Sequence, residues 1–329
     1  MTETDTNHLV DVLGEPYEQR VIELPEDDEG PVCATLVRRR APQPTAKAVL
    51  YLHGYNDYFF QEHLADFFVE RGFDFYALDL RKCGRSLRPH QTASFVRSMT
   101  EHFPEIDEAV RIIKSEDEGE GEGEDGHKTL VLFAHSTGGL IASLWAHVRS
   151  QSQPIDGLIL NSPFFELNAP WLIRRPIAAV VGRVAAWRPY WTFPMRLRGI
   201  YGRSLHKDFY GEWPFDTALK PLEGLPLRIG WLQAIRAAQR RLRAGLDITA
   251  PILVARSSAS FRGVEWSDEA HDADAVLNVD HIARWASVLG NHVTLVRIEG
   301  GKHDLTLSRE PARLAFFAEA DRWLRTYVI

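Results

Sequence analysis

The chain has 329 residues, of which 45% are hydrophobic, 25% charged and 11% aromatic. These ordinary values exclude the disordered, collagen-like and coiled-coil classes of protein. The formal net charge of −7 argues against a dedicated nucleic-acid-binding protein.

Cysteine content and the first residues bear on the cellular compartment. Cys33 and Cys83 are too few for a disulfide framework and fit a reducing environment. The acidic start Met1–Asp5 lacks the basic and then apolar profile of a signal peptide. No uncharged apolar run approaches the ~18–20 residues that span a bilayer. We therefore expect a cytoplasmic protein without a transmembrane segment.

Short apolar runs alternate with amphipathic stretches, a pattern that predicts a mostly parallel sheet flanked by helices on both faces. The expected core strands are Ala48–His53, Phe73–Leu80, Thr129–His135, Gly157–Asn161, Pro251–Ala255 and His292–Ile298. Two earlier strands, Glu18–Leu24 and Val32–Arg39, are separated only by an acidic turn, so an antiparallel pair should begin the sheet of eight strands. Helices are expected at Glu62–Arg71, Pro104–Lys114, Gly139–Arg149, Val279–Leu289 and Pro311–Leu324.

Two segments interrupt this alternation. Glu116–Asp125 is an acidic, glycine-rich tract that cannot bury apolar surface, and we interpret it as a solvated loop. Glu166–Leu246 carries five tryptophans, and fourteen Arg or Lys against five Asp or Glu. We interpret this second segment, called the cap below, as a helical insertion between core parts 1–165 and 247–329.

The stretch TLVLFAHSTGG indicates a nucleophile. The apolar run Thr129–His135 is followed by Ser136, and a helix is expected directly afterwards. This strand–turn–helix context holds a serine on a sharp elbow, where the helix N-terminus faces developing negative charge. Ala134 stands where the usual G-x-S-x-G pattern has its first glycine, and one methyl group still fits the turn. The alternative is that Ser136 only caps the helix.

A histidine and a carboxylate are the expected partners of Ser136. His303 lies in a glycine-rich loop after the last apolar run, where a general base would meet the nucleophile. The candidate acids are Asp268, Asp272, Asp274 and Asp280. We choose Asp274 because the apolar residues that follow it can dock its loop, with Asp272 and Asp280 as substitutes. The acid would hold the His303 tautomer and stabilise the imidazolium.

An oxyanion hole needs two backbone donors. One is the N–H of Thr137, which follows the expected nucleophile. The other is expected from the loop after Ala48–His53, where Gly54 permits a sharp turn and directs the Tyr55 N–H inward. We expect His53 to be a structural hydrogen-bonding residue and not a second base.

The motifs HGYNDY, DLRKCGRS, AHSTGG and GGKHD, with the cap between the last two, resemble the α/β-hydrolase family of monoacylglycerol lipases, lysophospholipases and serine aminopeptidases. The resemblance runs from roughly Lys47 to the C-terminus. It implies an α/β-hydrolase fold, a serine that is acylated and then freed by water, and these roles for Ser136, His303 and Asp274. In DLRKCGRS, Lys82 replaces the first glycine of the family's D-x-x-G-x-G-x-S turn, which we expect to be structural.

The resemblance implies a carboxylic ester hydrolase acting on a small-molecule or lipid ester, such as a monoacylglycerol or lysophospholipid. The alternatives are an aminopeptidase-like amide hydrolase and a catalytically silent binding module. No H-E-x-x-H or P-loop pattern occurs, and no G-x-G-x-x-G turn follows an early strand, so no metal and no cofactor is expected.

The composition of the cap suggests contacts of its own. Its tryptophans and Ile177–Val181 either line an acyl-binding pocket or form the cap's own small core. Its positive charge, in a chain of net −7, favours peripheral contact with anionic lipid surfaces. The arginines Arg236, Arg240, Arg241 and Arg243 share much of one helical face, and a solvated face is the simpler interpretation of them.

Overall fold

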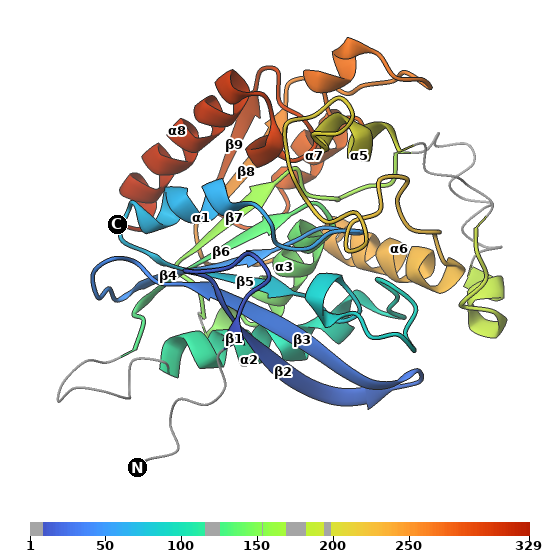
Figure 1. Cartoon of the computed structure of the whole chain (residues 1–329), viewed down its shortest axis with the longest axis horizontal. Coiled ribbons are helices and arrows are strands. Elements are labelled where there is room, and N and C mark those ends of the chain that lie inside the picture. The colour runs from blue at the N-terminus through green and yellow to red at the C-terminus, as the bar shows by residue number, and fades with distance from the viewer. Residues whose placement is uncertain (1–8, 116–125, 153, 169–181, 194–198) are drawn as a thin grey trace.

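The computed structural model describes residues 9–115, 126–152, 154–168, 182–193 and 199–329. Met1–Asp5, the acidic tract Glu116–Asp125 and Ile177–Val181 lie outside these residues. One twisted sheet runs through the centre of the molecule, with helices on both sides (Figure 1).

The sheet has nine strands in the order β1-β2-β3-β5-β4-β6-β7-β8-β9. The strands are β1 (Leu9–Val10), β2 (Glu18–Asp27), β3 (Gly30–Arg39), β4 (Lys47–Leu52), β5 (Asp74–Asp79), β6 (Thr129–His135), β7 (Gly157–Asn161), β8 (Ile252–Ser257) and β9 (Val293–Ile298). In this spatial order, every neighbouring pair from β5 to β9 is parallel. The pairs β1–β2, β2–β3 and β3–β5 are antiparallel. The predicted antiparallel start is confirmed.

The expected number of eight strands is one too low. The additional strand β1 has two residues, Leu9 and Val10, both exposed at the edge of the sheet. Two residues are too few to show the alternation by which a strand is recognised in a sequence. The other eight strands correspond to the eight predicted apolar runs.

Helices cover both faces of the sheet because strand side chains alternate between the faces. The helices are α1 (Glu62–Val69), α2 (Phe103–Ser115), α3 (Thr137–Val148), α5 (Ile200–Leu205), α6 (Ile229–Arg243), α7 (Val279–Ala286) and α8 (Glu310–Tyr327). Val49 and Tyr51 of β4 face a core with α1 and α8. Leu50 and Leu52 face the opposite core, which α2, α3, α6 and α7 complete.

In the residues that the structure describes, five single-turn 3₁₀ helices lie in the connections. They are η1 (Gly84–Ser86), η2 (Met99–His102), η3 (Ser150–Ser152), η4 (Asp268–His271) and η5 (Leu305–Leu307). Two of them flank predicted site residues, since η4 precedes Asp274 and η5 follows His303.

The parallel strands bring the predicted site residues to one edge of the sheet. Ser136 follows β6, His303 follows β9, and Asp274 lies on the connection after β8. The carboxyl ends of parallel strands meet at the same edge, which is where open α/β sheets place their ligands. The chain order therefore assembles a site from distant segments.

The described part of the cap lies between β7 and β8. It includes α5 and α6, joined by residues 206–228, which contain no helix and no named strand. Helix α6 packs along α3 beside the sheet (Figure 1). The boundaries 166 and 246 stay a prediction.

Candidate active site

Ser136 occupies the sharp turn between β6 and α3 that the sequence predicts. Its backbone has φ 52° and ψ −116°, a conformation that costs free energy in a residue with a side chain. Backbone hydrogen bonds fix the turn on both sides. The Ser136 N–H donates to Asn161 O at 3.0 Å, and the Phe164 N–H donates to Ser136 O at 2.9 Å.

Two glycines let the neighbouring backbone approach this turn. A Cβ atom at Gly138 would lie 2.3 Å from the carbonyl oxygen of His53, so only glycine fits at the start of α3. A Cβ atom at Gly54 would lie 3.1 Å from Ser136 Cβ. The loop after β4 therefore packs directly against Ser136.

His303 stands between Ser136 and Asp274. Its Nε2 lies 2.9 Å from Ser136 Oγ, and its Nδ1 lies 2.9 Å from Asp274 Oδ2. All three residues are buried, with 3%, 8% and 0% of His303, Ser136 and Asp274 exposed. A carboxylate can only accept at Nδ1, so Nδ1 carries the proton and Nε2 is free to accept one from the hydroxyl.

Asp274 is the one candidate acid that lies against His303. Its other oxygen, Oδ1, accepts from the N–H groups of Val276 and Leu277 at 2.8 Å each. Leu277 is buried and docks the loop, whereas Val276 is 39% exposed, so only one of the two apolar residues anchors it.

The three other candidate acids point elsewhere. Asp268 and Asp272 are exposed and face Arg309 at 3.2 and 3.5 Å. Asp280 is exposed in the first turn of α7. The geometry therefore favours the choice of Asp274, whose catalytic role stays a prediction.

A second buried carboxylate, Asp304, fixes the loop that carries His303. Its Oδ1 accepts from Asn161 Nδ2 at 2.7 Å and from Thr306 N at 2.9 Å, and its Oδ2 accepts from Gln61 Nε2 at 3.3 Å. Burial alone would raise the pKa of Asp304, but the electrostatic interaction with His135 and the hydrogen bonds that Asp304 accepts together outweigh burial and lower the pKa. Asp304 is thus an ionised anchor beside the predicted base.

Two further histidines, His135 and His53, lie close to the site, but His303 is the histidine that contacts Ser136 Oγ. The His135 ring is 4.8 Å from the His303 ring, and burial lowers the pKa of His135 below its usual value. His53 Nε2 accepts from the Leu80 N–H at 3.0 Å, while its Nδ1 lies 2.7 Å from Gly54 O. The expectation that His53 is a structural residue is confirmed.

The predicted oxyanion donors flank Ser136 from two elements. Thr137 is the first residue of α3, so its N–H has no carbonyl one turn earlier in the helix. Tyr55 follows Gly54 in residues His53–Tyr58, which we call the oxyanion loop. The role of both N–H groups stays a prediction.

The comparisons with known proteins agree with this architecture. A model of the family described as serine aminopeptidase, S33, matches residues 43–261. The chain belongs to this family of α/β-hydrolases. The predicted resemblance is thereby confirmed. No curated protein matches the chain at a significant level.

Solved structures of related hydrolases share the fold. A soluble variant of the Saccharomyces cerevisiae monoglyceride lipase, bound to a substrate analogue, has a TM-score of 0.67 at 15% identity and covers 100% of this chain and 98% of its own. The Paleococcus ferrophilus monoacylglycerol lipase has a TM-score of 0.61 at 19% identity, and the match covers 89% of this chain and 99% of that lipase. A thermostable Bacillus coagulans carboxyl esterase bound to glycerol has a TM-score of 0.64 at 14% identity, and the match covers 94% of this chain and 99% of that esterase. The expected α/β-hydrolase fold is confirmed.

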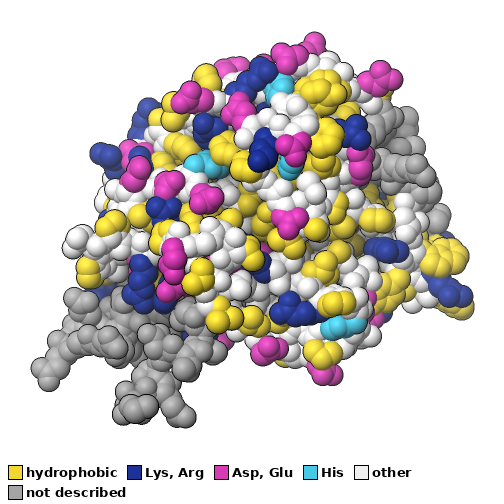
Figure 2. Space-filling model, in the orientation of Figure 1, with side chains coloured by type: hydrophobic (Ala, Val, Ile, Leu, Met, Phe, Trp, Pro, Cys, Tyr) yellow, Lys and Arg dark blue, Asp and Glu magenta, His cyan; other side chains and the backbone are white. Residues whose placement is uncertain are grey.

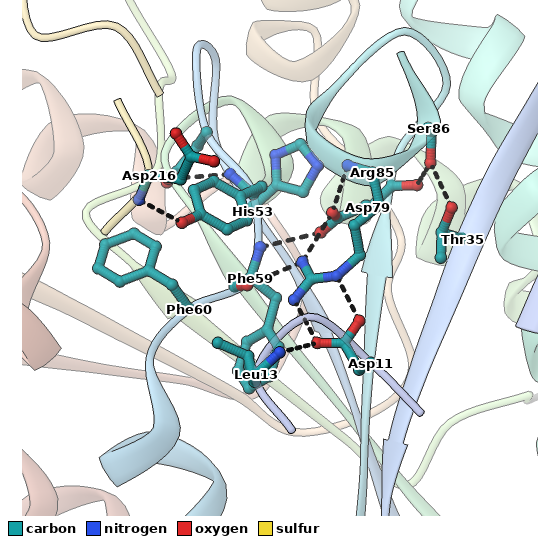
Figure 3. A network of polar contacts seen from close by, with 12 residues as sticks. Asp11, Leu13, Thr35, His53, Phe59, Phe60, Asp79, Arg85, Ser86 and Asp216 are labelled. Atoms are coloured by element: carbon teal, nitrogen blue, oxygen red, sulfur yellow. Dashed lines mark hydrogen bonds and ion pairs between the residues drawn. The ribbon is translucent and has the colours of Figure 1, made fainter. Parts of the chain in front are cut away.

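In this α/β-hydrolase, the turn DLRKCGRS joins three segments near the site (Figure 3). Asp79 accepts from the N–H groups of Phe59 and Arg85 at 2.9 and 3.0 Å. The Arg85 guanidinium binds both oxygens of Asp11 at 2.6 and 2.7 Å. Ser86 Oγ donates to Asp79 O at 2.7 Å. The turn is structural, as predicted.

Lys82, which replaces the first glycine of the family's turn, adopts a left-handed backbone conformation typical of glycine. Its φ is 61°, and its side chain is only 1% exposed. The ammonium group lies 2.6 Å from Asp27 Oδ2 and 2.6 Å from Glu29 Oε2, at the end of the β2–β3 hairpin. The lysine thus replaces a flexible residue with a buried ionic link.

Sequence reasoning missed the part of the cap that contacts the His303 loop. The Tyr201 ring lies edge-on to His303 at 5.3 Å, and its hydroxyl accepts from the Asp304 N–H at 3.2 Å. Lys302 Nζ donates to Ser204 O at 2.5 Å, and burial lowers the pKa of Lys302 to about 8. No periodicity in the cap sequence marks these residues.

Over the ranges that the structure describes, no group of three or more His, Cys, Asp or Glu is arranged to hold a metal ion. None of the described helices combines the length and the apolar character that crossing a bilayer requires.

Proposed function

We propose that this α/β-hydrolase cleaves carboxylic esters through an acyl-enzyme formed on Ser136. The observation that carries the proposal is the buried line of hydrogen bonds from Ser136 Oγ through the His303 ring to Asp274, 2.9 Å at each step. The strained backbone of Ser136 adds support, because such strain clusters at functional sites. A serine that only caps a helix needs neither feature.

In the proposed first step, His303 Nε2 accepts the proton of Ser136 as Oγ attacks the ester carbonyl carbon. The N–H groups of Thr137 and Tyr55 stabilise the oxyanion. When the intermediate collapses, the alkoxy oxygen leaves as the alcohol with the proton from His303. His303 next deprotonates a water molecule, which attacks the acyl carbon. His303 then returns this proton to Ser136 Oγ as the carboxylic acid is released. Asp274 stabilises the imidazolium in both halves.

We infer that the substrate is lipid-like, a monoacylglycerol or a lysophospholipid. Two structures that share the fold are named as lipases of monoacylglycerols. Two aromatic cap residues contact His303 and Tyr55, namely Tyr201 and Trp231, with ring distances of 5.3 and 4.2 Å. Aromatic walls suit an acyl chain.

The family description raises aminopeptidase activity as the second candidate. An aminopeptidase needs an acidic group to bind the substrate's free amine. The acids of the cap are Glu166, Asp208, Glu212, Asp216 and Glu223. Glu166 accepts from Trp285 Nε1 at 2.7 Å and faces Arg243, and the other four are exposed. This arrangement favours an ester substrate.

We also propose that the cap contacts anionic lipid surfaces. Trp187 and Trp191 are 86% and 57% exposed, and Arg183 and Arg188 are exposed beside them. Figure 2 shows yellow and dark-blue side chains together on the lobe at the right edge, which residues 182–193 form. Exposed indole rings with arginines are suited to the interface of an anionic membrane.

The test is a turnover assay with p-nitrophenyl esters of increasing acyl length, alongside aminoacyl p-nitroanilides and with S136A as the matched control. We expect ester turnover that rises with acyl length, little anilide turnover, and no turnover by S136A. Preferred cleavage of anilides would favour the aminopeptidase. A folded wild-type protein that turns over neither class would favour the silent binding module.

A further inference from the structure

The cap contacts the second half of the oxyanion loop. Four consecutive residues of the loop, 55–58, each contact a residue of cap segment 216–231. The contacts are Tyr55 with Pro226 and Trp231, Asn56 with Pro221, Asp57 with Lys220, and Tyr58 with Asp216. Figure 3 includes the last of these, in which the Asp216 N–H donates to the phenol oxygen at 2.8 Å. Cap and loop thus run against each other in opposite directions.

The cap also fixes the turn in the loop backbone. Asn56 has φ 54°, a left-handed conformation that asparagine tolerates better than most residues with a side chain. Asn56 Nδ2 donates to Pro221 O at 2.9 Å, which links this turn to the cap. Two residues before it, Gly54 packs on Ser136, since a Cβ atom there would lie 3.1 Å from Ser136 Cβ.

The central contact is a buried ion pair. The ammonium group of Lys220 binds Asp57 Oδ1, and the two residues are only 5% and 3% exposed. The ammonium also lies 5.5 Å from the Phe60 ring centre and 6.0 Å from that of Phe215. In such apolar surroundings each charge needs the other, because neither is solvated by water.

We propose that Lys220 is a positioning residue, which sets the oxyanion loop so that the Tyr55 N–H faces the developing oxyanion. The inference rests on the proposed function and deepens it. Loss of the ammonium breaks the link that holds the loop to the cap, so the loop shifts. It also leaves the Asp57 carboxylate buried without its counter-charge, which destabilises the fold. Because Tyr55 is two residues away, the shift moves a proposed donor while Ser136, His303 and Asp274 stay in place.

The experiment compares K220M with K82M in the full chain. Both variants delete a buried ammonium that binds carboxylates, but Lys82 binds the β2–β3 hairpin and not the oxyanion loop. For K220M we expect kcat for a p-nitrophenyl ester to fall about 10- to 100-fold, less than the loss of a whole oxyanion donor costs. KM and the pH profile of kcat/KM should stay unchanged, since His303 is untouched.

A transition-state probe separates positioning from general damage. An aryl trifluoromethyl ketone forms a tetrahedral adduct that uses the same donors, so its inhibition constant should rise by the same factor as kcat/KM falls. K82M should lose thermal stability but keep kcat and the inhibition constant. The double variant D57N/K220M removes the stranded carboxylate, so it should fold and still show the lowered kcat.

The outcomes distinguish the two proposals. Wild-type kcat in both K220M and D57N/K220M, on an ester that the wild-type protein hydrolyses, would overturn the positioning role alone. An equal loss of kcat in K82M would overturn it as well, because the effect would be general. A folded wild-type protein without any ester turnover would overturn the proposed function and this inference together.

Discussion

Asp274 offers the sharpest test at the scale of a single residue. It receives three hydrogen bonds, from two backbone N–H groups at Oδ1 and from His303 Nδ1 at Oδ2. The backbone donors hold the carboxylate in one orientation. His303 is therefore held by a group that does not itself move.

The substitution D274N keeps the shape of the side chain but places a donor or a neutral oxygen opposite Nδ1. We expect the wrong His303 tautomer and a fall in kcat of about 10⁴-fold, with the melting temperature nearly unchanged. The control is D272N, because Asp272 is exposed and faces Arg309. Steady-state kinetics and thermal melts check both. Near-wild-type turnover by D274N would assign the acid role to another residue.

Residue types and spacing were sufficient to select Ser136, His303 and Asp274. Each lies beyond the end of an apolar strand, and parallel strands deliver such positions to one edge. Lys220, Tyr201 and Asp304 could not be selected in this way. Their contacts depend on how the cap and the final loop fold back on the core, and no local pattern encodes that docking.

At the scale of elements, the junction of β4 and α3 sets the geometry of the site. Gly138 lies so close to the end of β4 that a Cβ atom would clash with the backbone oxygens of Leu52 and His53, at 2.8 and 2.3 Å. Those oxygens belong to the chain that leads into the oxyanion loop. A side chain at Gly138 would thus separate the two expected oxyanion donors.

We expect G138A to lower the free energy of unfolding by about 1–3 kcal/mol or more, because overpacking typically costs this amount. It should also lower kcat, because the two donors no longer converge. G182A is the control, since a Cβ atom there would meet only the Gln233 side chain at an ordinary 3.7 Å. Chemical denaturation and ester turnover measure the two effects. A G138A variant as stable and active as G182A would contradict the account of the junction.

Elements with a strong pattern were predictable, and short or irregular ones were not. The eight apolar runs and five amphipathic stretches correspond to strands and helices of the structure. Strand β1 was missed because two residues carry no periodicity. Residues 206–228 contact the core without regular secondary structure, so no helical or strand spacing indicated their path.

At the scale of the whole molecule, charge and exposed aromatic rings are unevenly distributed. The chain has a net charge of −7, while the cap has fourteen basic against five acidic residues. Within the described cap, residues 182–193 form a lobe on the side of the molecule away from α8 (Figure 1), and Trp187 and Trp191 of this segment are exposed. This asymmetry would orient the cap toward an anionic surface.

We expect the protein to bind vesicles that contain phosphatidylglycerol more strongly than phosphatidylcholine vesicles at low salt, and less as salt rises. The double variant W187A/W191A should bind at least about tenfold more weakly, since two indole rings no longer enter the interface. L314A serves as control, because Leu314 is 56% exposed on α8. Co-sedimentation provides the measurement. Equal binding to both kinds of vesicle would refute the surface contact.

Covalent labelling by a fluorophosphonate would reveal whether Ser136 is an activated nucleophile. The probe forms a stable bond only with a serine whose proton a neighbouring base accepts. Intact mass spectrometry of the wild-type protein should show one adduct per chain, and S136A should show none. An unlabelled, folded wild-type protein, with detergent or lipid present as well as absent, would contradict the account. An adduct that persists in S136A would contradict it equally.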